Sequence, residues 1–129
     1  MSLSRRVVAE CLGTAFLPAA VVGSGIMTEK LASGNIAIAL LANTVATGAT
    51  LTTLIFTFGP ISGAHFNPAV TLARAFTDTF AGIRLLDAPG FIVTQLLGAF
   101  VATILFRWLL PSLASEAKEV VFPRTDTGP

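Results

Sequence analysis

Three long apolar stretches, separated by polar segments, dominate the hydropathy pattern of the chain. They cover about residues 7–27, 35–58 and 89–110. A helix that rises 1.5 Å per residue needs about 20 residues to cross a hydrocarbon core of ~30 Å, and each stretch provides that length. The pattern therefore predicts three transmembrane helices.

A fourth apolar piece, about residues 68–76, is too short to cross. Its nine or so residues cover roughly half of the core. It begins at Asn67-Pro68, where proline loses no needed N–H and asparagine caps the first turn. The preceding Gly59-Pro60 is expected to end the second span and turn the chain back into the bilayer. We expect a re-entrant half-helix; an interfacial helix or a buried loop is the alternative.

The composition agrees with a membrane protein. Of 129 residues, 53% are hydrophobic and 12% charged, with a mean hydropathy of +0.80, which leaves too little polar surface for a small soluble domain. Residues 1–110 form the expected membrane domain, and residues 111–129 look like a polar, solvated tail. The net charge of +1, without a basic run, argues against a nucleic-acid partner.

Catalysis, cofactors and metals find little support in the sequence. The single cysteine, Cys11, has no second thiol for a disulfide or a metal site. One histidine and few carboxylates, without a nucleophile-and-base spacing, provide no basis for an enzyme. We expect no enzyme, no cofactor and no metal.

Three sequence strings carry a family resemblance. They are Ser-Gly-Ala-His-Phe-Asn-Pro-Ala-Val-Thr at residues 62–71, Ala-Glu-Cys-Leu-Gly-Thr at residues 9–14 and Thr-Gln-Leu-Leu-Gly-Ala at residues 94–99. Together they resemble the aquaporin (major intrinsic protein) family, whose members carry two inverted repeats, each with three spans and one Asn-Pro-Ala half-helix. This sequence contains one such repeat. The resemblance implies an all-α membrane protein with half of the aquaporin fold, completed by an antiparallel second copy.

The pore motif of the resemblance is Asn67, Pro68 and Ala69. The resemblance implies that two half-helices meet N-terminus to N-terminus at the membrane centre and that the pore passes the two asparagines. A helix N-terminus carries roughly half a positive charge, so two facing ends repel cations. The Asn67 amide would donate to a passing oxygen and interrupt a proton-conducting chain of water. The alternative is that Asn67 is only a helix cap.

Further residues are candidates for the pore lining or its filter. Gly63 and Ala64 are small enough for the loop carbonyls to face the lumen. Helical spacing predicts a pore-facing stripe on the second span, made of Asn43, Thr47, Thr50, Leu54 and Thr57. Thr47 falls on a filter position that the resemblance implies. Alternatively, the threonine hydroxyls bond to their own helix or to neighbouring helices.

A second filter position, commonly arginine in the family, is occupied by Val70. Losing a guanidinium removes hydrogen-bond donors and widens a constriction. Arg74, one helical turn later, either supplies a donor nearby or extends to the membrane interface. We therefore expect permeability to water and to small uncharged polyols or metalloid hydroxides.

Three polar residues are expected to brace the loop. Glu10 is a charge inside a span, which is costly unless it faces protein or water. The resemblance implies that Glu10 braces the re-entrant loop, and we expect a similar structural role for His65, with a pH gate as the alternative. Gln95 is expected to hydrogen-bond across a helix interface.

The basic residues are balanced between the two sides of the membrane. One side has Arg5, Arg6, Arg74 and Arg84, and the other has Lys30, Arg107, Lys118 and Arg124. Because lysine and arginine bias sets orientation, balance is compatible with insertion both ways round. We expect an antiparallel homodimer, which could assemble further into a tetramer of dimers. Its partners would be the second copy and membrane lipid, and its expected location is the bacterial inner membrane. A pore completed by another half-length chain and a non-conducting interaction protein or relic are the alternatives.

Overall fold

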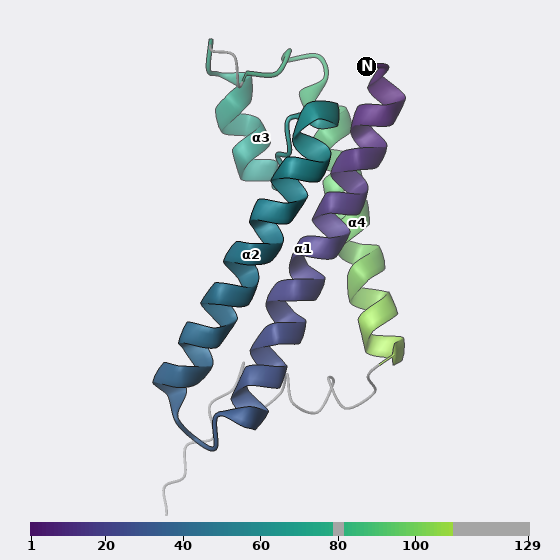
Figure 1. Ribbon diagram of the computed structural model, residues 1–129. Helices are drawn as coiled ribbons and strands as arrows, with labels where there is room; N and C mark the ends of the chain where they lie inside the picture. Colours follow the sequence, from purple (N-terminus) through teal and green to yellow (C-terminus); the bar gives the residue numbers. More distant parts are fainter. Residues whose placement is uncertain (79–81, 110–129) are drawn as a thin grey trace, which may run out of the picture.

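The computed structural model describes residues 1–78 and 82–109, which contain four helices and no strand. The helices are α1 (Leu3–Leu31), α2 (Ile36–Ser62), α3 (Pro68–Ala75) and α4 (Ala88–Leu109). Three of them, α1, α2 and α4, are long and apolar enough to cross a membrane. The expected fold class, three spanning helices and one short helix, is confirmed (Figure 1). The expected tail at residues 111–129 lies outside the described residues.

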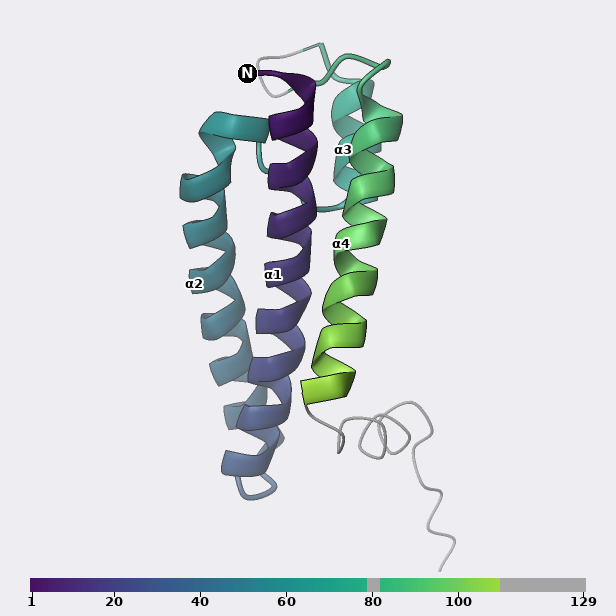
Figure 2. The ribbon, with the colours of Figure 1, turned by 90° about the vertical axis from the view of Figure 1, so that its right-hand side faces the viewer.

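The helix α1 is the centre of the bundle. It packs against α2 on one side and α4 on the other, and α3 packs against α4 (Figure 2). In the most apolar part of α2 only 6% of the residues are buried, compared with 22% in α1 and in α4. Outside its contact with α1, most of α2 is therefore open to lipid or another protein.

The second span does not end at Gly59-Pro60, and this expectation was wrong. The helix α2 continues through Pro60 to Ser62 and ends at Gly63, whose N–H donates to the Gly59 carbonyl at 3.0 Å. Gly63 has a φ of 94°, the left-handed conformation that glycine adopts without a Cβ penalty. The turn back into the protein is thus about one helical turn later than expected.

The segment after α2 is re-entrant. From Gly63 the chain runs back along the bundle to Asn67, and α3 then returns toward the end at which α2 finished (Figures 1 and 2). The side-chain Oδ1 of Asn67 accepts from the Ala69 N–H at 2.8 Å, and Pro68 occupies the first helical turn. The helix α3 therefore starts within the length of the bundle, and Asn67 caps this start.

Candidate pore loop and its bracing network

The loop between α2 and α3 has an unusual backbone. Besides Gly63, both Ala64 and Phe66 have a φ of 51°, in the left-handed region. That conformation brings the Cβ of a non-glycine residue too close to the backbone and costs roughly 1–2 kcal/mol per residue. The loop keeps this shape only if other contacts offset the cost.

Glu10 provides the strongest of these contacts. Its fully buried carboxylate accepts from the Ser62 hydroxyl at 2.6 Å and the His65 N–H at 3.0 Å through Oε1. Through Oε2 it accepts from the Phe66 N–H at 2.7 Å and the Gln95 amide at 2.8 Å. Consecutive N–H groups in such a loop form a concave anion site. Glu10 fills this site from within the same chain.

The hydrogen bonds continue from Glu10 into α3 and α4. The Gln95 amide also donates to the Thr71 hydroxyl at 2.9 Å, and Thr71 lies 3.1 Å from Nδ1 of His65. The His65 ring packs on Phe91 with 5.3 Å between ring centroids. The three residues expected to brace the loop thus lie in one set of contacts. We call Glu10, Ser62, His65, Thr71 and Gln95 the bracing network.

An apolar contact holds the other side of the loop. Phe66 is buried with Ala64 and Leu54, and its ring meets Phe58 edge to face at 6.0 Å. A Cβ at Gly13 would overlap the Phe66 ring. Gly13 therefore makes room for Phe66, a role that our sequence reasoning missed although the glycine stands in one of the family strings.

Arg74 hydrogen-bonds to the backbone of the loop. Its Nη1 donates to the Gly63 carbonyl at 2.7 Å. In the structure the Arg74 guanidinium is thus a donor to the loop, which is one of the two alternatives for this side chain. Gly63 is exposed, whereas Ala64 is buried and its N–H donates to the Ser62 hydroxyl at 3.2 Å. Ala64 thus packs in the core, and that the loop carbonyls at Gly63 and Ala64 line a lumen stays a prediction.

Asn67, Ala69 and Val70 are exposed on the open face of α3, and Pro68 is half-buried. The Oδ1 atom of Asn67 is occupied by the Ala69 N–H. Within residues 1–78 and 82–109 its side-chain NH₂ makes no hydrogen bond. The cap and the free amide donors therefore coexist in one side chain.

The five residues of the predicted stripe on α2 lie in different surroundings, and their facing a pore stays a prediction. Asn43 faces α1, where its Oδ1 accepts from the Ser24 hydroxyl at 2.7 Å, and Leu54 is buried against the loop. The Thr57 hydroxyl donates to the Thr53 carbonyl of its own helix at 2.8 Å. Thr47 and Thr50 are half-buried. Helical spacing could not separate these faces, because α2 is apolar all round.

A charged cluster closes the end of the bundle where α4 begins. Asp87 accepts from Arg84 Nη2 at 2.9 Å and Nε at 3.0 Å, and from Arg6 Nη1 at 3.1 Å. Arg6 also lies over the Phe91 ring, 5.0 Å from its centroid. The hydrogen bonds from Arg84 lower the pKa of Asp87, although burial acts in the opposite direction. Our sequence reasoning missed Asp87, whose only signal was its position directly before the third span.

A comparison with family models settles the relationship that these features suggest. The model for major intrinsic proteins matches residues 1–128. The chain belongs to the major intrinsic protein family. Since members of this family are passive channels, the chain is not an enzyme, and the bracing network is a structural arrangement and not a catalytic one.

Individual members of the major intrinsic protein family are similar to the chain over most of its length. The aquaglyceroporin AqpS of Rhizobium meliloti is 50% identical over 118 residues, which are 90% of this chain and 49% of the relative. The glycerol uptake facilitator protein-like 6 of Lactiplantibacillus plantarum is 35% identical over 127 residues, 96% of this chain and 54% of the relative. The aquaporin AqpM of Methanothermobacter thermautotrophicus is 36% identical over 120 residues, with 82% of this chain and 48% of the relative covered.

The chain thus spans about half the length of the curated major intrinsic proteins that it matches. No solved structure gave a significant match. With three helices long and apolar enough to cross a membrane, the chain is an integral membrane protein.

Proposed function

We propose that the chain forms one half of a passive channel for water and small uncharged solutes. The observation that carries the proposal is the exposed Asn67 amide at the start of α3, inside the length of the bundle. The partial positive charge of the helix start disfavours cations there. The free amide donors bind a solute oxygen in their place.

The solute range follows from Val70. This exposed apolar side chain stands three residues after Asn67, on the open face of α3. It offers neither a charge nor a donor, so a constriction beside it admits solutes wider than water. Polyols and metalloid hydroxides are neutral, small and rich in hydroxyl oxygens. Among the relatives, one is named an aquaglyceroporin and another a glycerol uptake facilitator protein-like 6.

The other half of the channel is a second copy in the opposite orientation. A two-fold axis in the membrane plane would bring the start of one α3 toward the start of the other, in the manner of inverted repeats. The nearly bare face of α2 is available for such contact. A heteromeric pore, in which a different half-length chain supplies the second Asn-Pro-Ala motif, is the runner-up.

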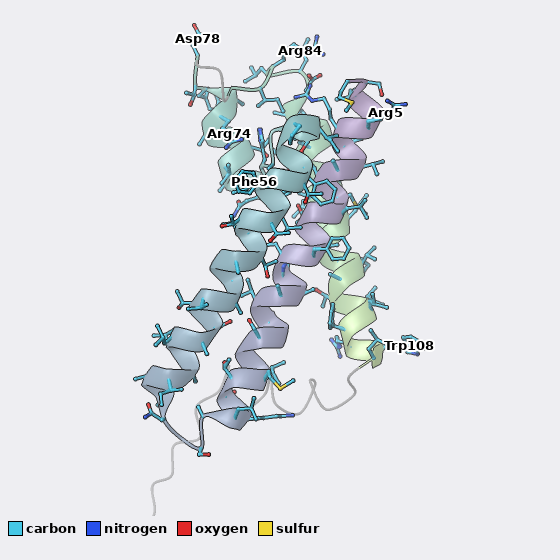
Figure 3. All side chains as sticks on the ribbon, in the orientation of Figure 1. Arg5, Phe56, Arg74, Asp78, Arg84 and Trp108 are labelled. Carbon is cyan, nitrogen blue, oxygen red and sulfur yellow. The ribbon has the colours of Figure 1, made fainter. Side chains whose placement is uncertain are left out.

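The basic residues of the whole sequence are compatible with insertion both ways round. Arg5, Arg74 and Arg84 lie at one end, with Asp78, and Trp108 marks the other end (Figure 3). Arg6 and Arg84 share the Asp87 carboxylate, which reduces the net charge of their end. Orientation depends on the bias of basic residues, and over the whole sequence four basic residues are expected on each side once Lys118 and Arg124 are counted with Lys30 and Arg107.

Reconstitution of the purified chain alone tests the channel and its self-pairing together. Stopped-flow light scattering on proteoliposomes is expected to show water and glycerol flux above that of protein-free vesicles, with no proton leak in a pH-dye assay. Water flux without glycerol flux would contradict the proposed solute range. Flux that requires a second, different half-length protein would favour the heteromer, and no flux in either case would favour a non-conducting protein.

A further inference from the structure

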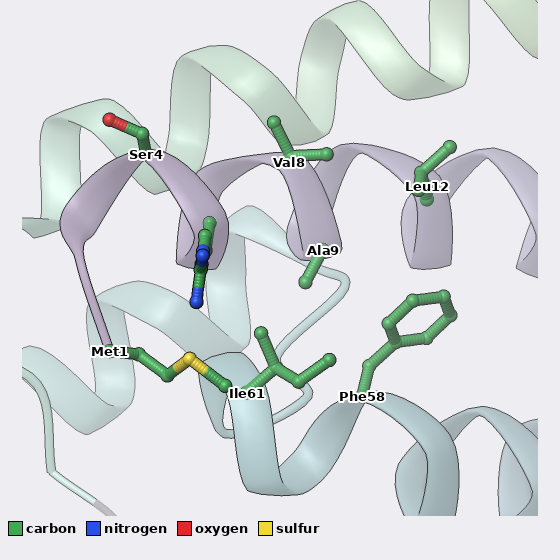
Figure 4. A pocket seen from close by; sticks show the side chains of 8 residues that line it. Met1, Ser4, Val8, Ala9, Leu12, Phe58 and Ile61 are labelled. Carbon is green, nitrogen blue, oxygen red and sulfur yellow. The ribbon is translucent and has the colours of Figure 1, made fainter.

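We infer that the groove between the start of α1 and the end of α2 is a binding site for an anionic phospholipid. The groove has a volume of about 380 Å³ and lies on the outer surface of the bundle. One side is formed by Val8 and Leu12 of α1, and the other by Phe58 and Ile61 of α2 (Figure 4). The buried Ala9 lies between them. An acyl chain fits this lining because it is almost entirely hydrocarbon.

The charge that selects the headgroup is Arg5, which also lines the groove. Its side chain lies at the same end of the bundle as Arg84 and is exposed (Figure 3). The other three arginines of this end have partners, since Arg6 and Arg84 bind Asp87 and Arg74 donates to the Gly63 carbonyl. Within the described part of the chain, Arg5 makes no hydrogen bond and no ion pair. Among the arginines of this end, Arg5 is therefore the one whose guanidinium is free to bind a phosphate.

The groove and Arg5 are placed relative to each other as the acyl chains and the headgroup of one lipid are. Arg5 precedes Val8 by one helical turn at the start of α1, and Leu12 follows one turn farther into the bundle. A phosphate on Arg5 at the membrane surface therefore has its acyl chains beginning beside the apolar walls. One basic residue near a membrane surface raises the affinity for an anionic lipid about fivefold. Phosphatidylglycerol is accordingly preferred to phosphatidylcholine by about that factor.

Native mass spectrometry of the purified full chain, with palmitoyl-oleoyl phosphatidylglycerol and phosphatidylcholine added in competition, measures this preference. The unchanged chain is expected to retain the anionic lipid about fivefold more. Arg5→Gln is expected to reduce the ratio to about one. Arg107→Gln, at the exposed end of α4 and away from the groove, is the matched control and is expected to leave the ratio unchanged.

Val8→Trp tests the apolar part of the site, because its ring occupies the groove while residue 8 itself is exposed. This variant is expected to lose both lipids, and circular dichroism verifies its helix content. Glycerol phosphate without acyl chains is expected not to displace the lipid. The inference is overturned if the two lipids bind equally, if Arg107→Gln lowers the ratio as much as Arg5→Gln, or if Arg5→Gln alters only the fraction of dimer.

Discussion

At the scale of single residues, Glu10 determines whether the pore loop has its shape. Two non-glycine residues in the left-handed region cost free energy, and the Glu10 carboxylate binds N–H groups of that same loop. Its four hydrogen bonds use all the acceptor positions of a carboxylate. The cost of burying the charge is therefore offset within the loop.

Glu10→Gln keeps the size of the side chain and replaces two acceptor positions by donors, which face the donors of the loop. We expect the free energy of unfolding to fall by about 2–3 kcal/mol. Unfolding in mixed detergent micelles at increasing SDS measures this change. Glu29→Gln, an exposed carboxylate at the far end of α1, is the control and is expected to change the value by less than ~0.5 kcal/mol. Equal effects of both variants would contradict a bracing role.

Val70 belongs to the same scale, because one side chain sets the proposed solute range. Val70→Arg adds a charge and donors to an exposed position of α3. We expect glycerol flux to fall at least tenfold and water flux to fall only a few-fold, since the narrower constriction still admits water. Stopped-flow measurements on the same proteoliposomes give both rates. Val70→Ile is the control, and a parallel loss of both fluxes in Val70→Arg would contradict the proposed filter role.

At the scale of elements, the close approach of α1 and α4 depends on one glycine. A Cβ at Gly98 would overlap the carbonyl oxygen of Cys11 in α1. Small residues at such crossings let helix backbones meet, and the resulting van der Waals contact holds membrane helices together. Because Gln95 is one turn away on α4, the same crossing also sets its distance to Glu10.

Gly98→Ala is expected to lower the free energy of unfolding by about 1–3 kcal/mol, because α4 must shift away from α1. Gly48→Ala is the matched control: a Cβ there has nothing within 4 Å, and alanine is the better helix former. We expect Gly48→Ala to be neutral or slightly stabilising in the same SDS titration. Similar losses for the two variants would mean that helix propensity, and not the crossing, explains the effect.

The link between α1 and the start of α4 depends on pH through Asp87. The folded-state pKa of this carboxyl is lowered, chiefly by the hydrogen bonds from Arg84. Its stabilising contribution is therefore complete above the usual aspartate pKa of about 3.9 and is lost as the pH falls through the lowered folded value. Melting temperatures between pH 6 and pH 3 are expected to fall more in the parent than in Asp87→Asn. Parallel pH profiles would contradict this assignment.

At the scale of the whole molecule, the question is what covers the bare faces of α2 and α3. Asn67 and Val70 are exposed in the single chain, and so is most of α2. A lipid-facing Asn67 amide would leave donors unpaired in hydrocarbon, which costs several kcal/mol per group. The proposed antiparallel copy removes that cost by enclosing a polar path.

Antiparallel pairing requires copies of both orientations in one membrane. In a Cys11→Ser background, Ser2→Cys places one thiol just before α1. An impermeant maleimide applied to intact spheroplasts is expected to label about half of the protein, and lysis is expected to expose the rest. Labelling of all copies, or of none, before lysis would exclude the antiparallel dimer.

Several features could be predicted from the sequence because they are local or compositional. Apolar runs longer than the hydrocarbon core predicted the three spans, and Asn67-Pro68 predicted the start of a helix too short to cross. Glu10, a charge inside a span, had to find partners within the protein. For these features, chain length, capping and the cost of an unpaired charge leave few alternatives.

Other features were decided only by the tertiary structure. Which face of α2 is buried could not be predicted, since a helix that is apolar all round carries no amphipathic signal, and only the structure shows that Asn43 meets Ser24 and that Leu54 packs against the loop. The contact between Arg74 and Gly63 joins residues on two elements. The sequence by itself thus determined the spans, the half-helix and the need to pair Glu10. Packing in three dimensions decided which residues meet, because contacts between distant segments depend on how the helices cross.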